Sequence, residues 1–256
     1  MVTKLPSVSI ITVVKNHREG LRETVDSLMS QTFSDWELLI IIGKSEDGTE
    51  ELAFKYESQD PRIFARLELG SGIYPAMNQG IQMTKSPLIW FMNAGDLFAS
   101  AEVLDKAQSE ISISNHALLI GGYQVREELD RTYVYSARKM TPLRFALNTR
   151  GGCHQAMIFR KAAIVDLGGF DESFLLAADF KLVLRIIKNF TVKRVSTIFA
   201  IIESGGASET GIKKVHSEKH FIRIGELGGF HIRMLSYAWT LLVQSKMRIR
   251  RIFPKN

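Results

Sequence analysis

The sequence lacks a second cysteine, a long apolar run and, over residues 231–256, any acidic side chain. With Cys153 alone, neither an intrachain disulfide nor a metal-binding cysteine cluster can form, and this fits a reducing compartment. No run reaches the roughly 18 apolar residues that a membrane-spanning helix needs. Pro6 leads directly into the strand-like Ser7–Val14 without the basic and apolar regions of a signal peptide, so we expect a cytoplasmic protein.

The excess of positive charge is confined to one segment. The chain carries 33 basic and 27 acidic residues, a net charge of +6, and residues 231–256 hold the whole excess. In this segment Ile232, Leu235, Trp239 and Leu242 recur on one helical face. Basic residues beside such a face favour an anionic membrane surface, with docking of the helix on the protein as the alternative. Nucleic-acid binders more often spread their charge over a domain face, so we expect no nucleic-acid partner.

The first hundred residues alternate between β-branched apolar runs and helical patterns. Strands are predicted at Val8–Val14, Trp36–Ile42, Ile63–Leu69 and Pro87–Met92, with a helix between each pair. This βαβαβαβ alternation predicts an α/β fold with a mostly parallel, doubly wound sheet. Such sheets bind their ligands at the carboxyl ends of the strands.

The rest of the chain is less regular and shows no repeat or convincing linker. We therefore expect one domain over residues 1–229, followed by a basic amphipathic helix or tail over residues 230–256. Further strands are predicted at Ala117–Val125, Arg131–Ser136, His154–Arg160 and Thr191–Ile202, and further helices at Ala101–Ile111, from Ala178, and near Ile212–Glu226 and Phe230–Met247.

Asp96 is the most conspicuous carboxylate at a strand end. It follows the fourth predicted strand and Gly95, where it could reach a Mg²⁺ or Mn²⁺ ion that bridges two phosphates, because both cations favour oxygen ligands. A turn residue or the N-cap of the next helix is an equally good interpretation of these residues alone.

Six segments resemble, in sequence and in order, the family 2 glycosyltransferases of the GT-A fold. The resemblance covers about residues 6–210 and is nearest to the branch that builds bacterial exopolysaccharide and O-antigen on a lipid carrier. It implies a Rossmann-like, mostly parallel central sheet flanked by helices, with C-terminal helices, and an enzyme that uses a nucleotide-sugar donor. The segments are PSVSIITVVKNHREGLRETVDSLMSQTFSDWELLII, KSEDGT, GIYPAMNQGI, LIWFMNAGD, CHQAMIFRK and LGGFDESFLLAADFKLVLR.

The resemblance also implies a donor site, from which several family residues are missing. The usual base-binding aspartate is replaced by Ile42, so a preference for uridine does not carry over. The neighbouring Lys44 would pair with a donor phosphate or a nearby carboxylate, or it is a solvated loop residue. Among the remaining implied residues, the base and ribose pocket would contain Thr12, Val13, Lys15 and Asn16, and the donor site would include Asn78.

The implied metal site is depleted in the same way. Pro75 stands for the acid of the family's GIYDAMN block, and Asn93 and Gly95 replace the first two acids of its D-x-D-D motif. Asn93 can still bond a ribose hydroxyl. Asp96 is then the one metal ligand, so Mg²⁺ or Mn²⁺ would bind weakly and in a donor-dependent manner.

For the transfer step, the resemblance puts Asp179 at the position of the catalytic base, although a carboxylate stabilised by the helix dipole is the simpler interpretation. His154 and Gln155 would hold the donor sugar or a phosphate, with a structural histidine as the alternative. Arg185 would orient Asp179 or contact phosphate, unless it forms a surface ion pair. Ser208, in a Gly- and Ser-rich loop, would touch a phosphate.

The leading hypothesis is an inverting glycosyltransferase of bacterial surface polysaccharide synthesis. It would transfer a sugar from a nucleotide-diphosphate sugar to a glycan or polyprenyl-linked acceptor, at the inner face of the cell membrane. The alternative is a catalytically impaired member of the fold that binds or scaffolds a glycan assembly complex, an option that the missing acids keep open.

Overall fold

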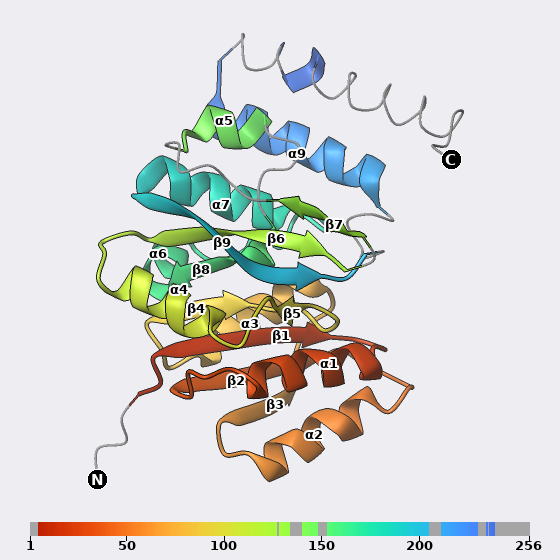
Figure 1. Cartoon of the computed structure of the whole chain (residues 1–256). Coiled ribbons are helices and arrows are strands. Elements are labelled where there is room, and N and C mark those ends of the chain that lie inside the picture. Colours follow the sequence, from red (N-terminus) through yellow and green to blue (C-terminus); the bar gives the residue numbers. More distant parts are fainter. Residues whose placement is uncertain are drawn as a thin grey trace.

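The computed structural model describes residues 5–126, 128–133, 140–147, 153–204, 211–229, 234 and 236–238. These residues form a layered α/β structure with helices on both faces of one sheet (Figure 1). The strands are β1 Val8–Val14, β2 Trp36–Ile42, β3 Ile63–Leu67, β4 Leu88–Phe91, β5 Leu97–Phe98, β6 Leu118–Val125, β7 Glu128–Tyr133, β8 Met157–Arg160 and β9 Val192–Ile202. The helices are α1 Arg18–Met29, α2 Thr49–Gln59, α3 Ile73–Met83, α4 Val103–Ser112, α5 Pro142–Leu147, the 3-10 turn η1 His154–Ala156, α6 Lys161–Asp166, α7 Ala178–Asn189 and α9 Ile212–Leu227.

The first half of the sheet is parallel, as its apolar runs predict. Its strands lie in the order β3-β2-β1-β4, and Val8 of β1 pairs with Trp36 of β2 while Val14 pairs with Ile42. Every residue of β2 is buried, which is the pattern of a strand covered on both faces. The carboxyl ends of these four strands therefore meet at one edge.

The second half joins this sheet through an antiparallel strand. β8 lies between β4 and β6 and runs antiparallel to both, while β9 runs parallel to β6 and antiparallel to the short β5. β6 pairs antiparallel with β7, which follows it in the chain. The expected fold class, an α/β sheet flanked by helices, is confirmed. Several boundaries differ. Residues 154–156 form the turn η1 before β8 begins at Met157, β3 ends at Leu67 and not at Leu69, and β7 covers Glu128–Tyr133 where Arg131–Ser136 was expected.

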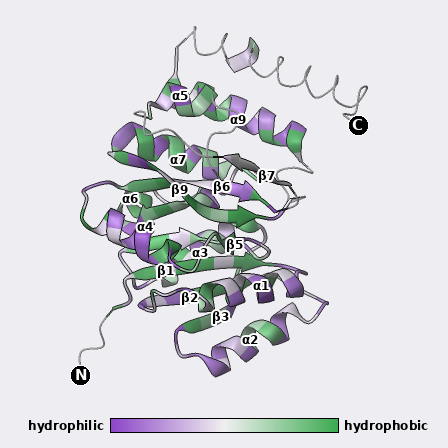
Figure 2. Cartoon of the chain, viewed as in Figure 1, coloured by the Kyte–Doolittle hydropathy of each residue, from purple (hydrophilic) through white to green (hydrophobic). Residues whose placement is uncertain are grey.

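Alternate residues of the central strands pack into two separate cores. Trp90 points to the core beneath α1, α2 and α4, where its ring centroid lies 5.2 Å from those of Phe98 and Phe199. The next residue, Phe91, points to the opposite core beneath α3 and α7, against Phe159. Figure 2 shows apolar residues along the strands and polar residues on much of the helix surface. The period-two alternation of a strand produces this division.

The predicted C-terminal helix and tail mostly fall outside the described residues, as do the side chains on which their membrane role depends. Within the described ranges, no helix is both long enough and apolar enough to cross a bilayer. The proposed domain boundary at residue 229 stays a prediction.

Two glycines offer a matched test of the core. A Cβ on Gly121 would lie 2.2 Å from the ring of the buried Phe199, so Gly121→Ala should destabilise the fold by about 1–3 kcal/mol through overpacking. A Cβ on Gly225 of α9 meets nothing within 4 Å, so Gly225→Ala should stabilise by about 0.4–1 kcal/mol. Urea denaturation measures both free energies of unfolding. Equal effects of the two substitutions would contradict this packing.

Candidate functional site

A cleft of about 430 Å³ crosses the carboxyl ends of the parallel strands. It runs from the end of β3, past β2 and β1, to the loop after β4 and the end of β9. Open α/β sheets bind ligands at this edge, where the direction of chain crossover changes. The cleft is lined by Val13, Val14, Lys15, His17, Ile41, Gly43, Glu68, Ser71, Gly72, Ile73, Ala76, Asn93, Ala94 and Glu203.

The floor of the cleft is held by bonds between two loops. Asn16 has a left-handed backbone (φ 47°); its N–H donates to Ser45 Oγ at 2.9 Å, and its Oδ1 accepts from the Glu46 N–H at 2.8 Å. The His17 N–H donates to Thr49 Oγ1 at 3.1 Å. Asn16, expected at the base and ribose pocket, is therefore used to join the β1–α1 and β2–α2 loops.

Strand alternation decides which of the other expected donor residues reach the cleft. Val13 and Lys15 line it, as expected. Thr12 and Ile42 are not among the lining residues, and the Ile42 side chain packs in the core beneath α1 and α2. Ile41 and Gly43 line the cleft instead, and Lys44 is exposed on the following loop.

Asp96 is a buried joint between three segments. The residue is only 4% exposed. Its Oδ1 accepts a hydrogen bond from the Glu203 N–H at 3.0 Å, and its Oδ2 accepts one from Gln155 Nε2 at 2.8 Å. Burial raises the pKa of Asp96 to about 6, against the opposing effect of these hydrogen bonds. Both oxygens are already engaged by protein groups and Asp96 is not among the residues that line the cleft, so the assignment of Asp96 as the metal ligand stays a prediction. Gln155 supports Asp96 in the same arrangement.

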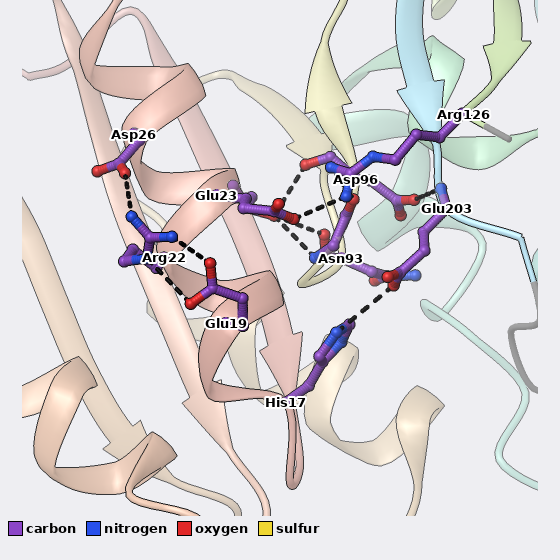
Figure 3. A network of polar contacts seen from close by, with 11 residues as sticks. His17, Glu19, Arg22, Glu23, Asp26, Asn93, Asp96, Arg126 and Glu203 are labelled. Carbon is purple, nitrogen blue, oxygen red and sulfur yellow. Dashed lines mark hydrogen bonds and ion pairs between the residues drawn. The ribbon is translucent and has the colours of Figure 1, made fainter. Parts of the chain in front are cut away.

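A different carboxylate faces the cleft. Glu203 directly follows β9, and its Oε2 lies 3.6 Å from His17 Nε2 (Figure 3). A Cβ on Gly95, whose φ is 97°, would lie 2.2 Å from Glu203 Oε2, so only glycine lets the carboxylate approach this loop. Asn93 Oδ1 is buried without a hydrogen-bond partner. Glu203 and Asn93 thus bring two oxygen types that suit Mg²⁺ or Mn²⁺ to the cleft.

These oxygens do not by themselves make a metal centre. Across the described residues, no three His, Cys, Asp or Glu side chains converge on one point. Substrate phosphates and water would have to supply the remaining ligands, as they commonly do for Mg²⁺.

An arginine also contacts the loop that contains Gly95. Arg126, just after β6, donates from Nη1 to Glu23 Oε2 at 2.8 Å and from Nη2 to the Gly95 carbonyl at 3.2 Å (Figure 3). Arg126 therefore ties α1 to the loop that carries Asn93.

Asp179 lies in the first turn of α7, beside the Asn93 end of the cleft. Its Oδ1 accepts from the Tyr74 hydroxyl at 3.0 Å, and its Oδ2 lies 3.2 Å from His154 Nδ1. The other ring nitrogen of His154 lies 3.3 Å from Asn93 Nδ2. The side chains form a continuous chain of polar contacts from the cleft to Asp179.

The electrostatics keep Asp179 ionised at neutral pH. Burial acts to raise the pKa of Asp179, but the hydrogen bond and charge of His154, together with the charge of Lys219, outweigh it and leave the pKa below its usual value. Burial and the neighbouring Asp179 raise the pKa of Tyr74, so its hydroxyl stays protonated as a donor. Asp179 can therefore accept a proton from a ligand hydroxyl.

Two expected site residues are engaged elsewhere. Arg185 donates from Nη1 to the Leu167 carbonyl at 2.7 Å and lies 3.9 Å from Glu226, so it joins α7 to its neighbours and does not orient Asp179. Asn78 donates to the Phe170 carbonyl at 2.9 Å and accepts from the Phe170 N–H at 2.9 Å, which fixes the loop before α7. Ser208 lies outside the described residues.

Sequence reasoning missed His17, Glu68, Tyr74 and Glu203. Glu203 directly follows the predicted strand Thr191–Ile202, and Glu68 lies near the end of the predicted strand Ile63–Leu69, so a search of every strand end, beyond the second and fourth, would have found both. Tyr74 had no such signal, because its partner Asp179 is 105 positions away.

Comparison with known proteins identifies the family. Residues 9–168 match the family described as Glycosyl transferase family 2. An uncharacterized glycosyltransferase of Mycobacterium tuberculosis is 28% identical over 72% of this chain and 70% of its own length. A PGL/p-HBAD biosynthesis glycosyltransferase of Mycobacterium bovis is 25% identical, covering 82% of each chain. A Bacillus subtilis protein named as a teichuronic acid biosynthesis glycosyltransferase, TuaG, is 29% identical over 61% of this chain and 63% of its own length.

Solved structures share the fold at lower identity. TarS of S. aureus, residues 1–349, superposes with a TM-score of 0.70 at 17% identity, over 92% of this chain and 70% of its own. The same protein is known with UDP-GlcNAc bound. The mannosyltransferase PcManGT of Pyrobaculum calidifontis, with GDP-Man and Mn²⁺, gives a TM-score of 0.67 at 14% identity over 93% of this chain and 70% of its own. The expected GT-A architecture is confirmed.

The buried joint predicts a specific dependence of stability on pH. Because the pKa of Asp96 is raised in the folded state, its contribution to stability is present below pH 3.8 and is lost as pH rises through about 6. Asp96→Asn removes this titration, so between pH 4 and 6.5 the unfolding free energy of the wild type should fall relative to the variant, on the order of 2 kcal/mol. Chemical denaturation across this range measures the difference. If the unfolding free energies of the wild type and the variant changed in parallel with pH, the raised pKa of the buried Asp96 would be contradicted.

Proposed function

This chain belongs to glycosyl transferase family 2, and from that membership we propose that it transfers a sugar with inversion from a nucleotide-diphosphate sugar to a glycan or lipid-linked acceptor. The observation that carries the proposal is Asp179, an ionised carboxylate that is held by Tyr74 and His154 and is linked through His154 to Asn93 of the cleft. An inverting transfer needs one such base on the acceptor side and no second carboxylate as nucleophile.

The cleft suits a nucleotide sugar laid across the strand ends. Its volume of about 430 Å³ lies in the range of small-molecule sites. The base belongs near the apolar β2–β3 end, the diphosphate near Lys15 and Asn93, and the sugar toward His154 and Asp179. TarS with UDP-GlcNAc and PcManGT with GDP-Man support this class of donor.

A divalent cation would be held by Glu203 and Asn93 together with the donor diphosphate. Mg²⁺ or Mn²⁺ bound there supplies positive charge that stabilises the departing diphosphate. Since the protein contributes so few ligands, the affinity for the cation should depend on the donor. PcManGT with Mn²⁺ supports the use of a metal.

In the transfer step, the acceptor hydroxyl gives its proton to Asp179 while its oxygen attacks the anomeric carbon. The bond from that carbon to the diphosphate oxygen breaks, and the nucleoside diphosphate leaves with the bonding electrons. Tyr74 donates to Oδ1 of Asp179 and His154 lies against Oδ2, so the proton goes to a lone pair of the carboxylate that these two partners leave open, and His154 links Asp179 to Asn93 of the cleft. These partners hold the base in place before the acceptor arrives.

The acceptor belongs to the bacterial cell surface. TuaG, with its name from teichuronic acid biosynthesis, supports surface polysaccharide synthesis as the biological role. A polyprenyl-linked acceptor requires contact with a membrane, which the basic segment 231–256 can make through anionic lipids. The intact Asp179 site and the named relatives favour this enzyme over the non-catalytic binding protein.

Replacement of the base gives the central kinetic test. Asp179→Asn should lower kcat by about 10²–10⁴-fold, because the amide cannot accept the proton, while donor binding measured by thermal shift persists. The control is Asp166→Asn, an exposed aspartate at the end of α6, which should keep wild-type activity. Similar kcat values for wild type and Asp179→Asn would rule out this base.

The membrane contact has a separate test. The full chain should pellet with anionic liposomes and less so with zwitterionic ones, and a version truncated after Gly229 should remain in the supernatant with both. Equal pelleting of the two versions with anionic liposomes would disprove the role of the tail.

A further inference from the structure

The donor cleft has an acidic side chain where the missing family aspartate leaves a gap. Ile42 is completely buried and points into the core, so it offers no hydrogen bond to a base. Gly43 follows it at the rim of the cleft and has no side chain, and the Lys15 side chain packs beside it, with its Cβ 3.1 Å from where a Cβ on Gly43 would lie. A carboxylate that reaches over Gly43 from a neighbouring strand would restore an acceptor at this end.

Glu68 reaches this place from the end of β3. Its N–H donates to the Ile42 carbonyl at 2.9 Å, which extends the pairing of β3 with β2 by one residue. A Cβ on Gly43 would lie 3.3 Å from Glu68 Oε1, so the carboxylate lies over the glycine. Glu68 also lines the cleft, and it is half-buried.

The backbone around Glu68 is fixed without its own side chain. Gln79 of α3 donates from Nε2 to the Leu67 carbonyl at 2.9 Å and accepts at Oε1 from the Leu69 N–H at 2.8 Å. Among the described residues, no hydrogen-bond or ion-pair partner of the Glu68 carboxylate is found, whereas Glu203 at the other end faces His17. The backbone on both sides of Glu68 is thus fixed, and its carboxylate remains available to a ligand.

The surroundings of this carboxylate suit a flat heterocycle. Val13, Ile41, Ile73 and Ala76 line the same cleft and offer apolar surface to a ring. Resting on the proposed function, we propose that Glu68 recognises the base of the donor nucleotide and selects bases that present a ring N–H.

The chemistry of the carboxylate sets the selectivity. An ionised carboxylate only accepts hydrogen bonds. Uracil and thymine offer N3–H, and guanine offers N1–H beside its amino group, so it can engage both oxygens. Cytosine and adenine present an unprotonated ring nitrogen beside their amino group, and its lone pair repels the second oxygen. Glu68 therefore selects UDP-, dTDP- or GDP-sugars over CDP- and ADP-sugars.

Calorimetric titration of the full chain with UDP, dTDP, GDP, CDP and ADP, in the presence of Mn²⁺, tests this assignment. The wild type should bind the first three more tightly than CDP and ADP. Glu68→Gln should weaken its best ligand roughly 10–100-fold, as expected when a charge-assisted hydrogen bond is lost. It should also improve the relative binding of CDP, because an amide presents both a donor and an acceptor to cytosine.

Two further variants separate selectivity from folding and charge. Glu46→Gln removes a carboxylate from the neighbouring exposed loop outside the cleft lining and should leave the order of the five ligands unchanged. Glu68→Asp keeps the charge and should retain the order at lower affinity. Either a wild-type preference for CDP or ADP, or an unchanged order in a folded Glu68→Gln, overturns the assignment while the proposed function stands. Failure of the wild type to bind any of the five would instead count against the proposed function.

Discussion

The two hydrogen bonds accepted by the buried Asp96 carboxylate hold the candidate site together. One comes from the Glu203 backbone at the end of β9 and the other from Gln155 in the turn before β8. Asp96 itself follows β4, so a single side chain joins the parallel half of the sheet to the antiparallel half at the edge where ligands bind. Burial disfavours the ionised form of this carboxylate and so raises its pKa.

This joint brings two neighbouring sets of side chains to one end of the cleft. Glu203 and Asn93 line the cleft, and His154, in the same turn as Gln155, lies between Asn93 and Asp179. The base end is built separately, from the ends of β2 and β3. An aspartate is thus present at the position where the family resemblance puts the base, while the carboxylates that line the cleft, Glu68 and Glu203, lie at the ends of β3 and β9.

Much of the fold follows from the sequence, because continuous apolar runs and helical spacing mark β1 to β4 and the helices between them. Ile42 could even be placed in the core from strand alternation alone. The sequence does not predict whether a polar atom is free to bind a ligand. Asp96, Asn78 and Arg185 each occupy an expected site position, yet each is engaged by protein groups distant in sequence. The spacing of residues along the chain carries no information on these contacts. A family resemblance assigns a role to a position but does not show which protein groups contact its side chain.

We propose that Asp179 acts as the one base of a transfer with inversion, and the stereochemistry of the product tests this role most directly. The measurement is the anomeric configuration of the product, read by proton NMR, with the nucleotide sugar that stabilises the protein most. We predict a configuration opposite to that of the donor, for example a β-linked product from an α-linked donor. A product that retains the donor configuration would contradict this role of Asp179.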